Sequence, residues 1–141
     1  MNALIIGLGS IGTRHLNNLY ALDVKDISAF RERNLSVPSS IPDTVSLYSD
    51  FDEALNKNPK IIIIANPTSM HIDYSQKALE SNCHLYIEKP ISDSMDGVEQ
   101  LLKLEKKTNR IIQVGCQLRF HPHLLKIKQQ LDLLMVELLM K

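Results

Sequence analysis

The chain has 141 residues, 44% of them hydrophobic and 23% charged, which is typical of one soluble globular domain and not of a disordered chain. Sixteen basic residues balance sixteen acidic ones, so we expect neither nucleic acid nor a membrane surface as a partner. The two cysteines, Cys83 and Cys116, show no CxxC spacing, and Met1 starts no signal-like leader, so we expect a cytoplasmic protein with two buried free thiols.

The first half of the chain predicts strands that alternate with helices. The expected elements, in order, are a strand at 3–6, a helix at 11–22, a strand at 26–31, a loop at 34–44 and a strand at 45–48. These predictions rest on apolar runs, on helical spacing of apolar residues, and on a cluster of Ser and Pro in the loop. Asp50 is expected to cap a further helix to about residue 58, because Glu53 occupies the capping-box position.

The second half continues the alternation. Four consecutive isoleucines at 61–64 predict a central strand, because a run that is apolar on both faces suits a sheet covered on both sides. The expected elements after it are a helix capped by Thr68 or Ser69 and running to about 81, a strand at 84–88, a helix from Ser94 or Asp96 to 108, and a strand at 111–115. This pattern predicts an α/β fold with a doubly wound parallel sheet. We expect one domain over 1–120 and a C-terminal helix over 121–141.

Three of the five glycines lie in one hexapeptide, Gly7 to Gly12, with G-x-G-x-x-G spacing. In this motif Gly7 allows a tight turn, Gly9 lets the backbone approach a pyrophosphate, and Gly12 allows close packing of helix on strand. Free N–H groups at the start of the following helix attract phosphate. Because the motif lies between an apolar strand and an amphipathic helix, we predict a dinucleotide site that also involves Ser10 and Ile11, rather than a ligand-free turn.

A charged triplet follows the second predicted strand. Glu32 lies twenty residues after Gly12, where a carboxylate can accept hydrogen bonds from the adenosine ribose hydroxyls of NAD. Its neighbours Arg31 and Arg33 can instead pair with the 2′-phosphate of NADP. The triplet therefore leaves NAD and NADP both open, and a solvated strand end is the alternative interpretation of each residue.

Four sequence blocks resemble the Gfo/Idh/MocA oxidoreductases. The blocks are GLGSIGTRH at 7–15, IIIIANPTSMH at 61–71, ALE through HLYIEKPI at 78–91, and VG through RFHP at 114–122. The resemblance implies a Rossmann NAD(P)-binding domain from an NAD(P)-dependent dehydrogenase. Its implied substrate is a secondary alcohol of a sugar, a cyclitol or a sugar nucleotide.

The Glu-Lys-Pro segment is the most specific part of this resemblance. It implies that Lys89 lies beside the nicotinamide and the substrate, where it orients the reacting hydroxyl and tunes its proton transfer as the catalytic residue. Glu88 and Pro90 are placed at the cofactor with it. The Lys89–Pro90 peptide bond is a candidate for the cis form, which would aim the lysine.

The resemblance also places residues after the isoleucine strand along the cofactor. It implies that Asn66, Pro67 and Thr68 line the ribose and nicotinamide side. His71 occupies the position of a histidine common in the family, and it either contacts the ligand or packs locally at the start of its helix. Histidine, cysteine and carboxylate residues show no metal-ligand spacing, so we predict no metal site.

Family members are much longer, and their second domain supplies a histidine general base. We therefore expect these 141 residues to carry the cofactor site and Lys89 but neither the substrate platform nor that base. The expected helix after Pro122 has an apolar stripe at heptad spacing, formed by Leu124, Ile127, Leu131, Leu134 and Leu138. This stripe predicts a homo-oligomer, and the alternative is that the domain's own sheet covers it.

Two other functions stay open beside the dehydrogenase. The first is a non-catalytic dinucleotide-binding module or truncated remnant that self-associates through its C-terminal helix. The second is an S-adenosylmethionine methyltransferase, which shares a glycine-rich first turn and an acidic end of the second strand. The Glu88-Lys89-Pro90 block speaks against the methyltransferase.

Overall fold

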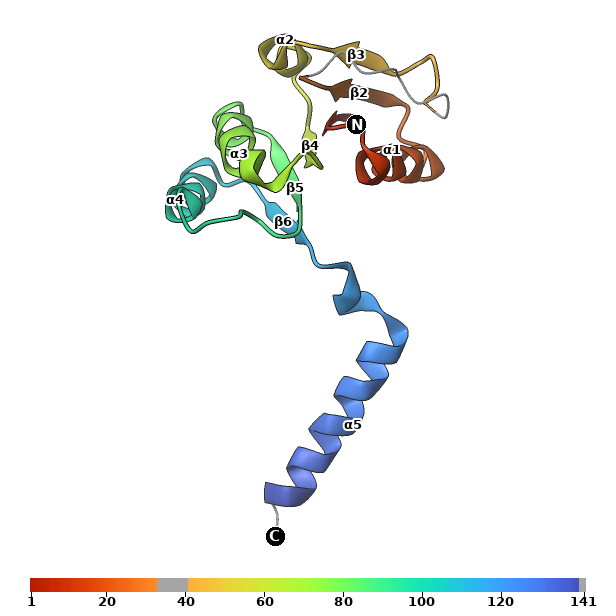
Figure 1. Ribbon diagram of the computed structural model, residues 1–141, viewed down its shortest axis with the longest axis vertical. Coiled ribbons are helices and arrows are strands. Elements are labelled where there is room, and N and C mark those ends of the chain that lie inside the picture. Colours follow the sequence, from red (N-terminus) through yellow and green to blue (C-terminus); the bar gives the residue numbers. More distant parts are fainter. Residues whose placement is uncertain (33–40, 140–141) are drawn as a thin grey trace.

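The computed structural model describes residues 1–32 and 41–139. Within these residues, parallel strands form one six-stranded sheet, and a last helix projects away from it (Figure 1). The strands are β1 Asn2–Ile6, β2 Asp26–Phe30, β3 Ser46–Tyr48, β4 Ile61–Ile64, β5 His84–Glu88 and β6 Ile112–Gly115. The helices are α1 Ser10–Ala21, α2 Phe51–Leu55, α3 His71–Glu80, α4 Val98–Thr108 and α5 Pro122–Leu139, with 3-10 turns η1 Thr68–Met70 and η2 Gln117–Phe120.

The strand order confirms the predicted doubly wound sheet. It runs β3-β2-β1-β4-β5-β6, and every pairing is parallel. The chain therefore moves outward from β1 in one direction and then restarts on its other side with β4. In such sheets, ligands bind at the carboxyl edge where the direction reverses. Here that position lies between β1 and β4.

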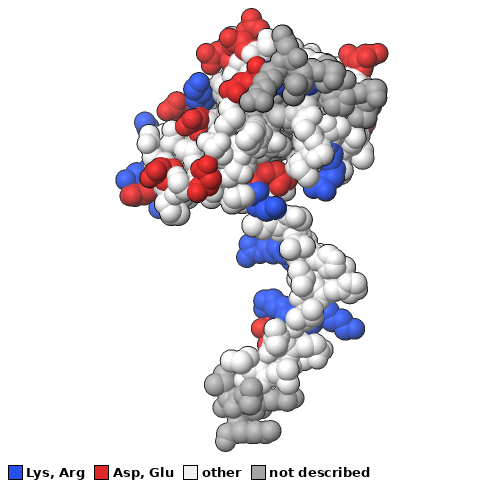
Figure 2. Space-filling model, viewed as in Figure 1, with Lys and Arg blue, Asp and Glu red and all other residues white. Residues whose placement is uncertain are grey.

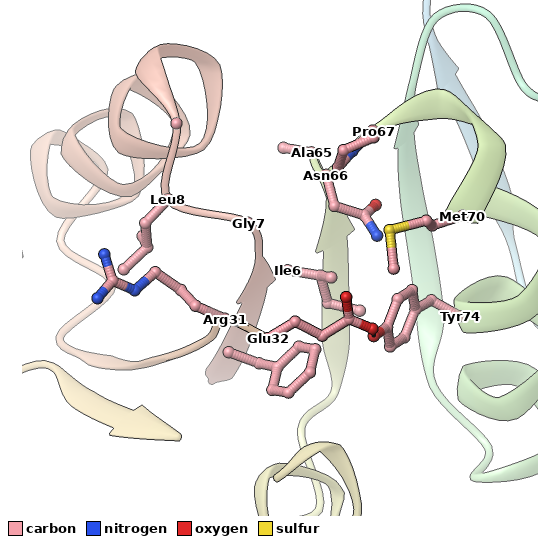
Figure 3. Close-up of a pocket in the computed structure, with 12 residues that line it drawn as sticks. Ile6, Gly7, Leu8, Arg31, Glu32, Ala65, Asn66, Pro67, Met70 and Tyr74 are labelled. Atoms are coloured by element: carbon pink, nitrogen blue, oxygen red, sulfur yellow. Dashed lines mark hydrogen bonds between the residues drawn. The ribbon is translucent and has the colours of Figure 1, made fainter. Parts of the chain in front are cut away.

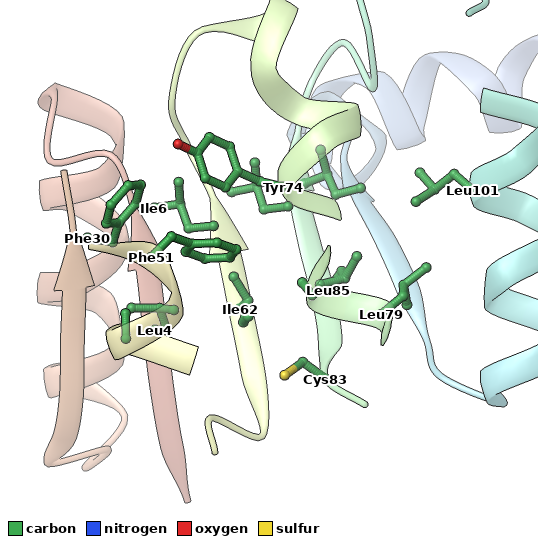
Figure 4. Packing of buried hydrophobic residues seen from close by; sticks show 14 residues of the cluster. Leu4, Ile6, Phe30, Phe51, Ile62, Tyr74, Leu79, Cys83, Leu85 and Leu101 are labelled. Carbon is green, nitrogen blue, oxygen red and sulfur yellow. The ribbon is translucent and has the colours of Figure 1, made fainter. Parts of the chain in front are cut away.

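Apolar side chains on both faces of the sheet are buried, which explains the run of four isoleucines. Ile62 and Ile64 pack with α2, α3 and α4 in a cluster that also holds Leu79 and Leu85 (Figure 4). Ile63 packs on the opposite face in a cluster with Leu16 of α1. Because alternate residues of a strand point to opposite faces, a central strand covered on both sides needs apolar residues at every position.

Helix α2 is shorter than expected, although its predicted cap is present. Asp50 accepts a hydrogen bond from the Glu53 backbone N–H at 3.0 Å, as the capping box predicts. The helix ends at Leu55 rather than near residue 58, and Asn58 takes a positive φ of 51°. The predicted loop at 34–44 lies mostly outside the described residues.

The predicted starts of the next two helices are wrong. Thr68 and Ser69 belong to the turn η1, and α3 begins at His71 without a side-chain cap. Helix α4 begins at Val98, after the predicted starts at Ser94 and Asp96.

Gly97 explains the late start of α4. It has a φ of +77°, which L side chains rarely adopt, and a Cβ there would lie 2.6 Å from the Ile72 side chain. A left-handed glycine that packs directly on α3 therefore precedes the helix.

The apolar stripe of α5 is not covered by the sheet. Every residue from 116 to 135 is exposed, and Figure 1 shows α5 directed away from the domain. In Figure 2 much of the surface of α5 is uncharged, whereas both charge signs are intermixed on the visible face of the domain. The alternative in which the domain's own sheet buries this helix is therefore wrong for the described residues.

The expectation of two buried thiols is half correct. Cys83 is 1% exposed, and burial raises the pKa of its thiol. Cys116 is exposed, because it follows β6 where the chain leaves the sheet for α5. Among the described residues, no helix is long and apolar enough to cross a membrane.

Candidate functional site

A pocket of about 500 Å³ lies at the carboxyl edge of the sheet, where β1, β2 and β4 end (Figure 3). Its walls come from the turn after β1, the end of β2, and the segment from β4 into α3. The lining residues are Ile6, Gly7, Leu8, Gly9, Phe30, Arg31, Glu32, Ala65, Asn66, Pro67, Met70 and Tyr74. The pocket thus occupies the position that the strand order marks as the ligand site.

The glycine turn forms an open cradle beside the start of α1. Gly7 has a φ of +89°, and a Cβ there would lie 2.9 Å from the Ala65 carbonyl oxygen. A Cβ on Gly12 would collide with the Gly7 carbonyl oxygen, so both residues must be glycine for the turn to pack. A Cβ on Gly9 would meet nothing within 4 Å. The position at Gly9 is therefore open, and a ligand can approach the backbone there.

The N-terminus of α1 fits an anion at this cradle. Gly9 is the N-cap residue, no side chain caps the helix, and its first turn has no acidic residue. The amide groups of Ser10, Ile11 and Gly12 therefore lack the side-chain acceptor that usually satisfies them. A pyrophosphate supplies such an acceptor, and the helix dipole favours its negative charge.

Glu32 lies just past the end of β2, as the sequence predicts, and it is held by a residue that the sequence did not reveal. The Tyr74 hydroxyl donates a hydrogen bond of 2.6 Å to Glu32 Oε1. Burial raises the pKa of Tyr74 well above its usual value, and the adjacent Glu32 carboxylate adds to the shift. The signal in the sequence was weak: Tyr74 is one helical turn past Met70, on the helix that starts beside the pocket.

Of the two arginines beside Glu32, only Arg31 lies among the described residues. Arg31 lines the pocket, and its side chain points away from Tyr74 in Figure 3. Its backbone N–H donates to the Tyr48 carbonyl oxygen at 3.0 Å. Arg33 lies outside the described residues.

Asn66 presents an unsatisfied side-chain amide to the pocket. Its Nδ2 and Oδ1 atoms are both buried, and neither has a hydrogen-bond partner among the described residues. An unpaired buried polar group costs about 1–3 kcal/mol, so native structures seldom retain one without a ligand or water to satisfy it. Pro67 lines the same pocket, while Thr68 belongs to the turn η1 and is not among the lining residues.

His71 joins two loops rather than lining the pocket. His71 is buried, with 1% of its surface exposed. Its Nδ1 lies 3.0 Å from the Pro90 carbonyl oxygen, and its Nε2 lies 3.0 Å from the Asn66 carbonyl oxygen. A neutral ring can donate to one of these oxygens and a protonated ring to both. This geometry favours the interpretation of His71 as a local packing residue that connects the segment after β4 to the segment after β5.

Glu88 forms a second contact that the sequence did not reveal. His15 Nε2 of α1 lies 2.7 Å from Glu88 Oε1 at the end of β5, and both side chains are largely buried. The His15 ring packs edge-on against Tyr86 at 5.1 Å between centroids. Burial raises the pKa of the Tyr86 hydroxyl, and the Glu88 charge adds to this shift. The glycine-motif helix is thus tied to the strand that leads into the Glu-Lys-Pro segment.

Lys89 is exposed and follows the carboxyl end of β5, next to β4 in the sheet. The Lys89–Pro90 peptide bond is cis. Lys89 therefore lies at the same edge as the pocket, although beyond its lining. The other predicted site residues outside the lining are Ser10, Ile11, Gly12, Thr68, His71, Glu88 and Pro90. The described residues contain no group of three or more His, Cys, Asp or Glu that could hold a metal ion.

The arrangement fits an extended dinucleotide laid across the edge of the sheet. From β2 through β1 and β4 to β5, the edge presents the Glu32 carboxylate, the Gly9 cradle, the Asn66 amide and then Lys89. The edge thus presents, in order, a carboxylate that can accept hydrogen bonds from hydroxyls, a site for an anion, an unpaired amide and a cation. The buried orphan atoms of Asn66 and the open space at Gly9 are the observations that favour a ligand.

Comparisons with known proteins agree with this geometry. Residues 1–116 match the sequence model of Gfo/Idh/MocA, described as an oxidoreductase family with an NAD-binding Rossmann fold. The chain is 34% identical over 129 residues to the uncharacterized oxidoreductase YrbE of Bacillus subtilis, covering 88% of this chain and 38% of the relative. It is 27% identical over 132 residues to the myo-inositol 2-dehydrogenase of Thermotoga maritima, covering 91% and 40%.

The fold is also found in a solved structure with a bound cofactor. The scyllo-inositol dehydrogenase of Lactobacillus casei, with bound NAD(H) and scyllo-inositol, superposes with a TM-score of 0.76 at 23% identity, covering 94% of this chain and 41% of that one. The chain thus spans about two fifths of the length of the relatives it matches. The family match favours the dehydrogenase over the methyltransferase alternative. The chain belongs to the Gfo/Idh/MocA oxidoreductase family, whose members share this NAD-binding Rossmann fold.

Proposed function

We propose that this chain is the cofactor-binding part of an NAD(P)-dependent dehydrogenase that acts on a secondary alcohol of a sugar, a cyclitol or a sugar nucleotide. When bound, the nicotinamide accepts or supplies the hydride that leaves or joins the alcohol carbon. Relatives named as inositol dehydrogenases support a polyhydroxylated substrate. The observation that carries the proposal is the open cradle at Gly9, bordered by the uncapped start of α1.

The binding roles follow from the groups that border the pocket. The amides at the start of α1, at Ser10, Ile11 and Gly12, hold the pyrophosphate. Glu32 accepts hydrogen bonds from the ribose hydroxyls, and the orphan Asn66 amide donates to or accepts from the cofactor. The glycine motif thus binds the charged centre of the cofactor, while residues that follow β2 and β4 orient its polar ends.

Lys89 is the proposed catalytic residue. Its exposed ammonium follows the end of β5, where it can donate a hydrogen bond to the substrate hydroxyl and stabilise the charge that develops as the proton moves. The 2.7 Å contact between Glu88 and His15 restrains the residue just before Lys89. Replacement of Lys89 by Ala in the enzyme that contains this domain should reduce kcat strongly and leave cofactor affinity nearly unchanged.

The finer statements about partners and location are part of the same proposal. We propose a homo-oligomer formed through α5, supported by exposed apolar side chains along this helix. These are Leu124, Leu125, Ile127, Leu131, Leu133, Leu134 and Met135. A cytoplasmic location is supported by the two unpaired cysteines.

Isothermal titration calorimetry with NAD+ and NADP+ tests the cofactor site. Gly9→Val is the best variant, because its Cβ meets no protein atom and fills only the space proposed for pyrophosphate. We expect Gly9→Val to abolish measurable binding while the thermal unfolding temperature stays close to that of the unchanged chain. Asn17→Val, an exposed change later in α1, is the matched control and should bind normally. Equal binding by Gly9→Val and the unchanged chain would contradict the cofactor assignment.

The non-catalytic module is distinguished by turnover. An enzyme containing this domain that binds NAD+ but oxidises no polyol, sugar or sugar nucleotide would favour the module. Steady oxidation of any of these substrates, lost in Lys89→Ala, would favour the dehydrogenase.

A further inference from the structure

Tyr74 reaches the cofactor pocket from a rigid aromatic cluster. Its ring packs against Phe30 and Phe51, with centroid distances of 5.5 and 4.9 Å, and those two rings lie 5.3 Å apart. The residue is 8% exposed. Three mutually packed rings leave Tyr74 little freedom to rotate. Its hydroxyl is therefore held at one place on the pocket wall.

The hydroxyl holds a side chain that otherwise has considerable freedom. Glu32 is an exposed residue beyond the end of β2, and a glutamate in such a place samples several rotamers. The 2.6 Å bond from Tyr74 Oη to Oε1 selects one of them (Figure 3). The phenol remains a donor to high pH, because burial and the carboxylate raise its pKa.

The bond leaves Glu32 able to bind more than Tyr74. A carboxylate has about four acceptor positions on its two oxygens, and Tyr74 occupies one. The others remain for the hydroxyls of a ribose. A 2′-phosphate would instead bring negative charge against the carboxylate, and a free glutamate could rotate away to relieve this repulsion. The bond from Tyr74 opposes that rotation.

We propose that Tyr74 is a positioning residue that fixes the Glu32 carboxylate for the adenosine ribose and thereby makes the pocket select NAD over NADP. This inference rests on the proposed function of the pocket. Arg31 also lines the pocket and favours phosphate, but Figure 3 shows its side chain directed away from Glu32 and Tyr74. Among the described residues, the Glu32 carboxylate rather than the Arg31 guanidinium is therefore the charged group that lies against Tyr74.

Calorimetric titration of the whole chain with NAD+ and with NADP+ tests the inference in Tyr74→Phe. This variant keeps the packed ring and removes only the hydroxyl. We expect NAD+ affinity to fall up to about tenfold, because the freed Glu32 side chain must then be ordered by the cofactor itself, and NADP+ affinity to fall much less or to rise. The ratio of the NADP+ dissociation constant to the NAD+ dissociation constant should therefore shrink by up to about tenfold.

Tyr20→Phe is the matched control. It also removes a tyrosine hydroxyl, one that contacts Thr44 Oγ1 at 2.5 Å, and Tyr20 packs in the cluster on the other face of the sheet. We expect this variant to leave the ratio of dissociation constants unchanged. If Tyr74 only supports the fold, Tyr74→Phe weakens both cofactors by one factor and the ratio stays constant, which overturns the inference.

A double variant adds a test that does not depend on how well Tyr74→Phe folds. In Glu32→Ala, addition of Tyr74→Phe should not change the ratio further, because the group that Tyr74 positions is already gone. A further change of similar size would overturn the inference. Failure of the unchanged chain to bind either cofactor would instead overturn the proposed function itself. Binding of NAD+ with an unaltered ratio in Tyr74→Phe would overturn only the role of Tyr74.

Discussion

The sheet that carries the pocket and helix α5 are both built from regular apolar patterns, yet they differ in what covers them. Ile62 of β4 is 0% exposed, whereas Leu131 of α5 is 56% exposed. The period of a pattern predicts which face of an element is apolar. It does not tell whether the same chain contains the surface that buries that face. The two regions should therefore respond very differently to the same chemical change.

Truncation of a buried and an exposed aliphatic side chain tests this contrast most strongly. Ile62→Ala should lower the free energy of unfolding by about 2–5 kcal/mol, because it removes packed methyl groups and leaves a cavity. At protein concentrations low enough to keep the chain monomeric, Leu131→Ala should change it by less than about 0.5 kcal/mol, as is usual for surface substitutions. Urea unfolding followed by circular dichroism measures both. A larger loss in Leu131→Ala that appears only at higher protein concentration would report the proposed association through α5, whereas a loss as large as that of Ile62→Ala in the monomer would contradict the exposure of this helix.

The two regions also contain carboxylate contacts of similar length and different burial. His15 and Glu88 lie 2.7 Å apart with side chains 14% and 16% exposed. Lys128 and Asp132 lie 2.6 Å apart on α5 with side chains 71% and 62% exposed. Water screens the exposed pair and competes for its hydrogen bond. The contact distance alone therefore overstates how similar the two pairs are.

Removal of one charge from each pair gives the next largest expected effect. Glu88→Gln should lower the free energy of unfolding by about 1–3 kcal/mol, because it weakens a largely buried charge-assisted bond. Asp132→Asn should lower it by about 0.5 kcal/mol or less. Chemical unfolding at pH 7 and low salt compares them directly. Equal losses would show that the burial of His15 and Glu88 does not strengthen their contact.

Local patterns in the sequence predicted the architecture well, because they depend on neighbours in the chain. The isoleucine run predicted the central strand β4, and the glycine motif predicted the turn between β1 and α1. The same local rules failed where a contact with a residue far away in the sequence affects where a helix begins. Helix α4 begins directly after Gly97, which packs against Ile72 of α3. It does not begin at the potential capping residues Ser94 and Asp96.

The candidate site could be predicted in part for the same reason. Residues at strand ends, such as Glu32 and Asn66, can be placed at the sheet edge from the strand pattern alone. Their partners cannot, because the Tyr74 bond to Glu32 spans 42 residues and the His15 bond to Glu88 spans 73. Such pairs form only after the sheet has brought separate segments together. Their side chains carry no periodic signal that would reveal the contact beforehand.

Alkaline pH gives the smallest of the expected effects and tests the Tyr74 bond inside the domain. Burial and Glu32 raise the pKa of Tyr74 in the folded chain, while the unfolded chain keeps the ordinary value of about 10. Below pH 10 both states hold the phenolic proton, and its contribution to stability is complete. Above pH 10 the unfolded chain releases this proton and the folded chain retains it, so the free energy of unfolding falls as pH rises.

The expected slope from Tyr74 is at most about 1.4 kcal/mol per pH unit. Other groups also contribute to the pH dependence, so the measured quantity is the difference between the unchanged chain and Tyr74→Phe in urea unfolding from pH 9 to 11. We expect Tyr74→Phe to lose stability less steeply above pH 10 than the unchanged chain does. Helix α5 has no tyrosine, so a difference of this kind reports on the domain alone. Parallel curves would indicate that the Tyr74 hydroxyl is solvated rather than held against Glu32, because only a buried and bonded phenol resists ionisation to this extent.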